Sequence, residues 1–89
     1  LGGAPTIHKA ALISGGAYKE ISLASDLGLD AFITGNFDEP AWHLAHEGDV
    51  HFFALGHHAT ERIGPKALMN YCANNYNLDV SFIDEDNPF

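Results

Sequence analysis

The chain has 89 residues, which is enough for one small domain and too few for two independent hydrophobic cores. Its 46% hydrophobic and 18% charged residues are typical of a folded protein and argue against disorder. The net charge of -8, with four Lys and Arg, argues against a nucleic-acid partner and suits the binding of cations.

Cysteine content and hydropathy indicate the compartment. Cys72 is the single cysteine, which excludes a disulfide framework within the chain and favours a packed thiol on the apolar face of a helix. No apolar stretch approaches the roughly 18 to 20 residues of a membrane span. We therefore expect a cytoplasmic protein without membrane contact. Residues 1–6 resemble a linker, so we expect one α/β unit, 1–89, that forms the C-terminal part of a longer two-part protein.

The first half of the chain repeats a strand, a turn and a helix. Ala10–Ser14 is a short apolar run that ends at Gly15-Gly16, and we expect a strand there. Ile21, Leu23, Ala24 and Leu27 then recur at helical spacing until Gly28, which predicts a helix that stops at this glycine. Gly15-Gly16 lacks the full spacing of a phosphate-binding loop, so a tight turn is the better interpretation.

The same pattern continues to the end of the chain. Ala31–Thr34 and Val50–Leu55 predict two further strands, with a helix beginning near Pro40 between them. A helix opened by Pro65 follows, and Leu78–Ile83 is the final β-rich run. The order βαβαβαβ predicts an α/β fold with a mainly parallel sheet. The strands are apolar at consecutive positions, as expected if both faces of the sheet are covered, and we expect the helices to pack on the sheet.

Three turns follow the predicted strands at their carboxyl ends. They contain Gly15-Gly16, Thr34-Gly35-Asn36 and Gly56-His57-His58. Ligands of open α/β sheets bind outside the carboxyl ends of the strands, so these turns should share one functional edge.

His57 and Glu61 are the strongest candidate ligands in that edge. Imidazole and carboxylate groups bind divalent metals, and a four-residue offset puts both on one face if the backbone is helical. The alternative is a surface loop in which Glu61 pairs with Arg62 or Lys66. Spacing alone leaves both interpretations open.

Several motifs together resemble the C-terminus of the Nif-three-like dinuclear metal-centre family, whose bacterial members are often labelled type-two GTP cyclohydrolase I homologues. The resemblance runs from about Ala10 to Phe89 and is specific because the motifs agree in order. They are Gly15-Gly16, Asp30–Gly35, His43, Gly56–Arg62, Ala67-Leu68, Leu78–Asp84 and Asn87-Pro88.

The resemblance implies a Nif-three-like fold and a site with two divalent metal ions, with Zn, Fe, Mn, Ni and Mg as candidates. His57 and Glu61 match the family's C-terminal ligands, and Glu61 is a candidate to bridge the two ions. The family's N-terminal His-His motif and further aspartate have no counterpart here, so the site is incomplete in this chain. Asn36 stands where the family usually has an acidic residue.

Other polar residues near this edge have two interpretations. His58 lacks the four-residue relation to Glu61, which favours a supporting or substrate-facing role. Thr34 and Asn36 are further candidates for such a role, and His43 is a candidate for either a site residue or a hydrogen-bonded structural histidine. We expect His8, His46 and His51 to be solvated or structural, and the acidic residues 84–86 to form a solvated terminus.

Two functions remain after these observations. The resemblance implies a metal-dependent hydrolase acting on a small molecule, with a purine nucleotide such as GTP as one candidate substrate. The competing class is a non-catalytic metal-binding scaffold or regulatory protein that assembles with itself into a ring, by resemblance a hexamer. Nothing in the residues themselves selects guanine.

Overall fold

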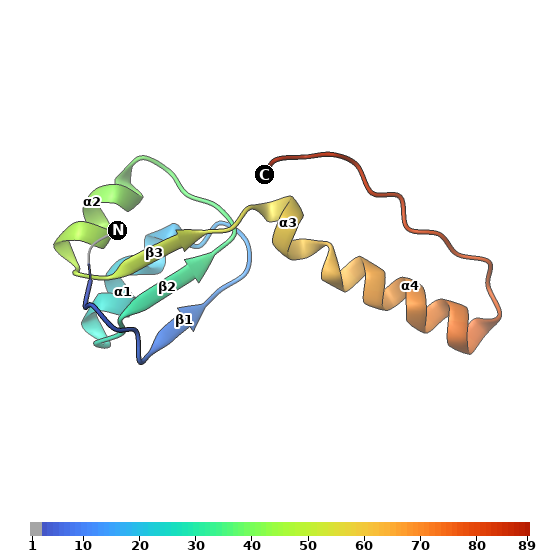
Figure 1. Cartoon of the computed structure of the whole chain (residues 1–89), viewed down its shortest axis with the longest axis horizontal. Helices are drawn as coiled ribbons and strands as arrows, with labels where there is room; N and C mark the ends of the chain where they lie inside the picture. The colour runs from blue at the N-terminus through green and yellow to red at the C-terminus, as the bar shows by residue number, and fades with distance from the viewer. Residues whose placement is uncertain (1–2) are drawn as a thin grey trace.

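The structure, a computed structural model, describes residues 3–89. Three strands and two helices form a lobe, residues 3–55, and a long helix with a returning tail forms an arm, residues 56–89 (Figure 1). The molecule is therefore elongated, with extents of 52 × 24 × 20 Å. The elements of the lobe are β1 (Ala10–Leu12), the 3-10 turn η1 (Tyr18–Glu20), α1 (Ile21–Asp26), β2 (Ala31–Thr34), α2 (Pro40–Glu47) and β3 (His51–Ala54).

The sheet is three-stranded and parallel, in the order β1-β2-β3. Each pair of strands is joined by a helical crossover, as the alternating sequence pattern predicts. Ala11, Phe32 and Phe52 share one row of the register, and Leu12, Ile33 and Phe53 share the next. Because side chains alternate along a strand, these two rows lie on opposite faces of the sheet.

The core lies between the sheet and the helices α1 and α2. Phe32 is 1% exposed and its ring stacks on Phe52 at 6.2 Å between centroids. Small residues let the helices approach these rings closely. The other members of the buried cluster are Ile21, Ala24, Ala41, Ala45 and Val50.

α1 ends just before Gly28, the glycine that the sequence predicted as its stop. The helix ends at Asp26, and Gly28 follows with φ of +67°, in the left-handed region that glycine adopts without steric cost. The amide of Leu29 donates to the carbonyl of Ala24 at 3.0 Å, which closes the end of the helix and leads into β2.

The arm begins with α3 (His57–Glu61) and continues through Arg62 into α4 (Ile63–Tyr76). The helix thus starts two residues before Pro65, which lies in its first turn, where a missing amide costs no hydrogen bond. Asn77 has φ of 51° and turns the chain, and the tail runs back along α4 towards the lobe (Figure 1).

The predicted fourth strand, Leu78–Ile83, is wrong: this segment of the described chain has no regular structure. It lies beside α4, where no strand edge offers main-chain partners, so its β-rich composition has nothing to pair with. Side-chain contacts hold it instead, including the Lys66 ammonium 4.8 Å from the centre of the Phe82 ring.

The predicted α/β fold with helices packed on a parallel sheet is confirmed, and within residues 3–89 the helices lie on one face. α1 and α2 lie on the face that carries Phe32, and no helix covers the face that carries Leu12 and Phe53 (Figure 1). Leu12 is 78% exposed and Phe53 is 40% exposed.

Candidate functional site

The three strand-to-helix turns meet at one edge of the sheet, as the sequence predicted. The amide of Gly35 donates to the carbonyl of Gly15 at 2.8 Å, which joins the first two turns. A Cβ atom on Gly16 would lie 3.8 Å from His57 Nε2 and 3.9 Å from the Cβ of Asn36. The turns after β1, β2 and β3 therefore converge around His57.

Thr34 holds this edge together. Its side chain is buried, and its hydroxyl donates to the carbonyl of Gly15 at 2.8 Å and accepts from the amide of Ala17 at 3.2 Å. Both hydrogen bonds are made to the first turn. Thr34 therefore fixes the position of Gly15-Gly16 relative to β2.

His57 and Glu61 lie on one turn of helix and contact each other. The separation between His57 Nδ1 and Glu61 Oε1 is 2.8 Å. The two side chains are 44% and 48% exposed, so both are accessible from solvent. The helical backbone that the four-residue spacing required is present.

The alternative partners of Glu61 are engaged elsewhere. Arg62 forms an ion pair and hydrogen bond with Asp84, and Lys66 lies over the ring of Phe82. In this structure Glu61 therefore pairs with the His57 ring and not with Arg62 or Lys66.

A segment from the end of the tail caps α3. The carbonyl of Phe89 accepts from the amides of His58 at 2.7 Å and Ala59 at 3.3 Å, which are first-turn groups without intrahelical partners. Gly56 permits this approach: its φ is +89°, and a Cβ there would lie 2.8 Å from the carbonyl carbon of Phe89. The tail thereby sets the position of the helix that carries both candidate ligands.

Asp84 makes a second connection between the tail and α3. Its carboxylate pairs with Arg62 and lies 3.5 Å from His58 Nε2. That nitrogen is buried and has no hydrogen-bond partner in the described structure, although the Asp84 carboxylate lies within ion-pair distance of it. His58 therefore faces the tail, whereas His57 faces the edge of the sheet.

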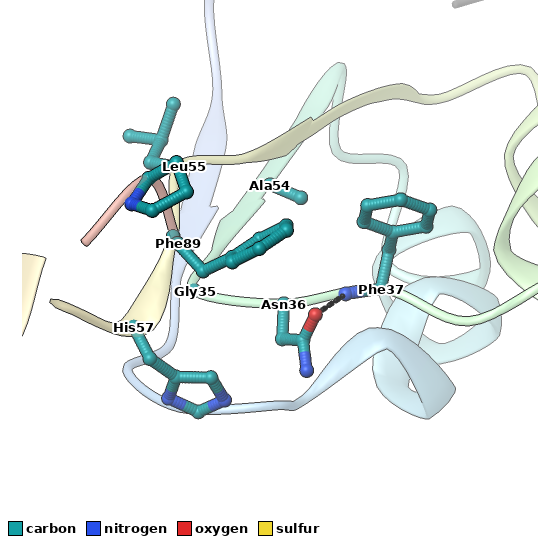
Figure 2. A pocket seen from close by; sticks show the side chains of 9 residues that line it. Gly35, Asn36, Phe37, Ala54, Leu55, His57 and Phe89 are labelled. Carbon is teal, nitrogen blue, oxygen red and sulfur yellow. Dashed lines mark hydrogen bonds between the residues drawn. The ribbon is translucent and has the colours of Figure 1, made fainter. Parts of the chain in front are cut away.

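A cavity of about 310 Å³ lies between His57 and the end of the tail. Figure 2 shows the ring of Phe89 beside Ala54 and Phe37, with the side chains of His57 and Asn36 below it in this view. Asn36 Oδ1 accepts from the amide of Phe37 at 2.8 Å, and the amide nitrogen of Asn36 is the donor group of this side chain. The remaining lining residues are Gly35, Ala54, Leu55, Gly56 and Pro88.

A second cavity of about 430 Å³ adjoins the first through Phe37 and Ala54. It is lined mainly by apolar side chains, including Trp42 and Phe52, with the carboxylates of Asp38 and Glu39 at its margin. A ligand held near His57 thus has an apolar, partly aromatic surface beside it.

The other histidines lie outside this edge. His43 is exposed on α2 and does not line either cavity. His46 Nδ1 contacts the carbonyl of Trp42 at 2.8 Å, and His51 Nε2 contacts the carbonyl of Ala4 at 2.6 Å, which confirms their predicted structural roles. The backbone amide of His8 donates to Asp30 at 2.8 Å.

Within residues 3–89, no group of three or more His, Cys, Asp or Glu side chains lies close enough together to hold a metal ion. His57 and Glu61 therefore do not form a complete metal site within these residues. None of the helices in this part of the chain is long and apolar enough to cross a membrane.

Sequence reasoning missed the contributions of Asp84 and Phe89. The acidic residues 84–86 are exposed, as expected of a solvated terminus, but Asp84 also pairs with Arg62. The opposite charges of Arg62, near the start of the arm, and Asp84, near its end, are a weak signal of this contact. No signal in the sequence indicates that a carbonyl of residue 89 caps α3.

Comparison with known proteins places this arrangement among relatives. A family model described as Duf34/NIF3 (NGG1p interacting factor 3) matches residues 2–88. The chain is 60% identical over 89 residues to the "GTP cyclohydrolase 1 type 2 homolog" of Chlamydia trachomatis, covering all of this chain and 36% of that protein. It is 49% identical over 82 residues to the protein of the same name from Yersinia pestis, covering 92% of this chain and 33% of that one.

A solved structure gives the same fold. It is described as "protein ybgI, unknown function", and it matches with a TM-score of 0.89 and 45% sequence identity. The match covers 98% of this chain and 35% of that chain. The chain thus spans about a third of the length of the relatives that it matches.

Proposed function

The chain belongs to the Duf34/NIF3 family, and on that premise we propose that it supplies His57 and Glu61 to a dinuclear divalent-metal site in a metal-dependent hydrolase. The observation that carries the proposal is the 2.8 Å separation of His57 Nδ1 and Glu61 Oε1 on one helical turn. Metal–ligand distances near 2.0–2.2 Å place neighbouring donor atoms about 3 Å apart, so this pair is close to the spacing that one shared ion requires.

The donor set fits such an ion in part. One imidazole and one carboxylate are ligands that Zn, Fe and Mn accept, but at least one further protein ligand is needed for a catalytic site. We infer that the further ligands come from a part of the protein outside residues 1–89. The resemblance to the family implies a His-His pair and an aspartate there, and two ions in all.

The bound ions would lower the pKa of a coordinated water and polarise the group under attack. This chain's residues have other tasks in that scheme. His57 and Glu61 hold the ions, and Gly16, which has no side chain, leaves room beside His57 Nε2. The Asn36 amide can donate a hydrogen bond to a ligand in the cavity, and the apolar wall formed by Phe37 and Phe89 limits the access of bulk water.

The names of the relatives suggest a substrate class. Relatives carry the name GTP cyclohydrolase 1 type 2 homolog, and a purine nucleotide is the candidate that this name suggests. The adjoining cavity beside Trp42 and Phe52 could accommodate a planar ring. The alternative function is a metal-binding scaffold that forms a ring of identical subunits, in which the same ligands have no catalytic task.

The experiment uses the full-length protein that contains this chain. Metal content after dialysis and Zn²⁺ or Mn²⁺ affinity by calorimetry are compared for the wild type, His57→Ala, Glu61→Gln and the control Glu47→Gln, which changes an exposed carboxylate on α2. We expect both site variants to lose at least about 10-fold in affinity, as for direct metal ligands, and the control to match the wild type.

Turnover then separates the two functions. Metal-dependent hydrolysis of a nucleotide panel that disappears in Glu61→Gln supports the hydrolase. Metal-dependent assembly without turnover, measured by sedimentation, supports the scaffold. Unchanged metal affinity in both site variants would refute the proposed ligands under either function.

A further inference from the structure

The sheet has one uncovered face. Leu12, Ile33 and Phe53 form one row across its three strands, and we call this row the open face. Leu12 is 78% exposed, although it lies within a strand, and Phe53 is 40% exposed. The row of Ala11, Phe32 and Phe52 on the opposite face is packed against α1 and α2.

This asymmetry is unusual for a parallel sheet. Parallel sheets occur almost only with both faces covered, because their helical crossovers pack on the strands and their strands are apolar on both sides. In an antiparallel sheet with one solvent-exposed face, apolar and polar residues alternate along each strand. Here both rows are apolar, so the open face has the composition of a buried one.

The open face also has a hollow. A depression of about 360 Å³ lies at its carboxyl end, between Leu12 and Ile33 on one side and Leu55 and Thr60 on the other. A flat partner would leave this space empty. A partner that fits must present a ridge of side chains, as a helix does.

The described chain does not supply that partner. α1 and α2 are committed to the opposite face, and α4 points away from the lobe (Figure 1). Folding α4 back over the strands would break the contacts of α3 with Phe89 and Asp84, which fix the start of the arm.

The length of the relatives indicates the occupant. This chain covers 36% of the Chlamydia trachomatis relative and 35% of the ybgI chain, so roughly two thirds of a protein of that size lies outside it. We propose that helices from the remainder of the same polypeptide cover the open face and complete the sheet as a two-sided α/β layer. A second copy of this face is a poorer fit, because two hollows placed opposite each other would leave the space between them unfilled.

Two matched substitutions in the full-length protein test the proposal. Leu12→Ala and Leu27→Ala remove the same atoms from residues that are 78% and 65% exposed in this chain. If the side chains were as exposed in the full-length protein as in this chain, neither substitution should change its Tm. If the remainder of the polypeptide covers the open face, Leu12→Ala should lower the Tm of the metal-free protein by about 5–10 °C and Leu27→Ala by less than about 2 °C.

Side-chain footprinting tests the same proposal on the wild type, so the result does not require that a substituted protein folds. Hydroxyl-radical labelling should leave Leu12 and Phe53 protected and Leu27 modified, at every protein concentration. Equal labelling of Leu12 and Leu27 would overturn the proposal. Protection that is lost on dilution to single subunits, as measured by sedimentation, would also overturn it, because the occupant would then be a second copy. Chelated protein is used throughout, so the result is independent of whether His57 and Glu61 bind metal.

Discussion

The lobe and the arm divide stability and chemistry between them. All fully buried apolar residues, from Ile21 to Val50, belong to the lobe, whereas α4 has no buried residue at all. The candidate ligands His57 and Glu61 belong to the arm, in its first turn. The sheet of the lobe thus provides the edge, and a less buried helix carries the candidate ligands beside it.

The two regions are also held by different forces. Apolar packing around Phe32 holds the lobe. Hydrogen bonds and ion pairs hold the start of the arm, through the carbonyl of Phe89 and the carboxylate of Asp84. Polar contacts of this kind contribute little to global stability, typically up to about 1 kcal/mol each. They do determine how the arm is oriented where it leaves the lobe. Substitutions in the two regions should therefore affect different measurements.

Phe32→Ala should have the largest effect, on stability. The ring is 1% exposed, and its removal leaves a cavity under both helices, so we expect the free energy of unfolding to fall by about 3–5 kcal/mol. Chemical denaturation of the full-length protein measures it. Leu23→Ala is the control, because Leu23 is 52% exposed on α1. A loss below about 1 kcal/mol for Phe32→Ala would contradict the placement of the core.

Gly56→Ala should have a smaller and more local effect, on the arm. The left-handed φ of +89° and the 2.8 Å approach to Phe89 both oppose a side chain, at a cost on the order of 1–3 kcal/mol. We expect the cap of α3 to open, so that amide hydrogen exchange at His58 and Ala59 accelerates. Metal affinity of the full-length protein should fall by about 10-fold because the ligands lose their fixed position.

Gly64→Ala is the matched control for that substitution. Gly64 lies in α4, and a Cβ there would meet no atom within 4 Å, so alanine should stabilise the helix by roughly 0.5–1 kcal/mol. Metal affinity and exchange at His58 should stay unchanged. If Gly56→Ala and Gly64→Ala behave alike in both measurements, the cap by Phe89 does not position α3.

Asp30→Asn should have the smallest effect, seen only in acid. The backbone amides of His8 and Lys9 donate to its carboxylate at 2.8 and 2.9 Å and hold the pKa of Asp30 below its ordinary value of 3.8. A carboxyl whose pKa is lowered by folding stabilises the folded chain above the ordinary value. That contribution disappears as the pH falls from 3.8 through the lower value in the folded protein.

Urea midpoints measured from neutral pH into the acid range provide the readout for Asp30→Asn. The wild type should lose more stability than the variant over the acid part of the range, while metal affinity is equal at neutral pH. Asp26→Asn is the control because Asp26 is exposed on α1. Parallel curves for the wild type and Asp30→Asn would show that the two amides do not stabilise the carboxylate.

Local pattern was sufficient to predict much of the lobe. The apolar run Ala31–Thr34 is a strand with those limits, and the helix of the first unit ends at Asp26, two residues before Gly28. The convergence of the three turns also followed from sequence, since the carboxyl ends of parallel strands meet at one edge. The four-residue offset of His57 and Glu61 needed only a helical turn to bring the two side chains together.

Features that depend on a distant partner could not be predicted in this way. Leu78–Ile83 has the composition of a strand but lies where no strand edge is available, so composition alone gave the wrong structure. Asp84 has the composition of a solvated tail but pairs with Arg62. In both cases the structure that forms depends on which distant segment of the chain packs beside the residue.

By itself, the sequence determined the order of the first three strands and the helices between them, the shared edge of the turns and the proximity of His57 and Glu61. Each of these follows from periodicity or from short-range spacing. The tertiary structure decided the rest. It placed the carbonyl of Phe89 on the first turn of α3, and it left Leu12 and Phe53 uncovered on one face of the sheet. Both depend on contacts between segments far apart in the chain, which no local pattern encodes.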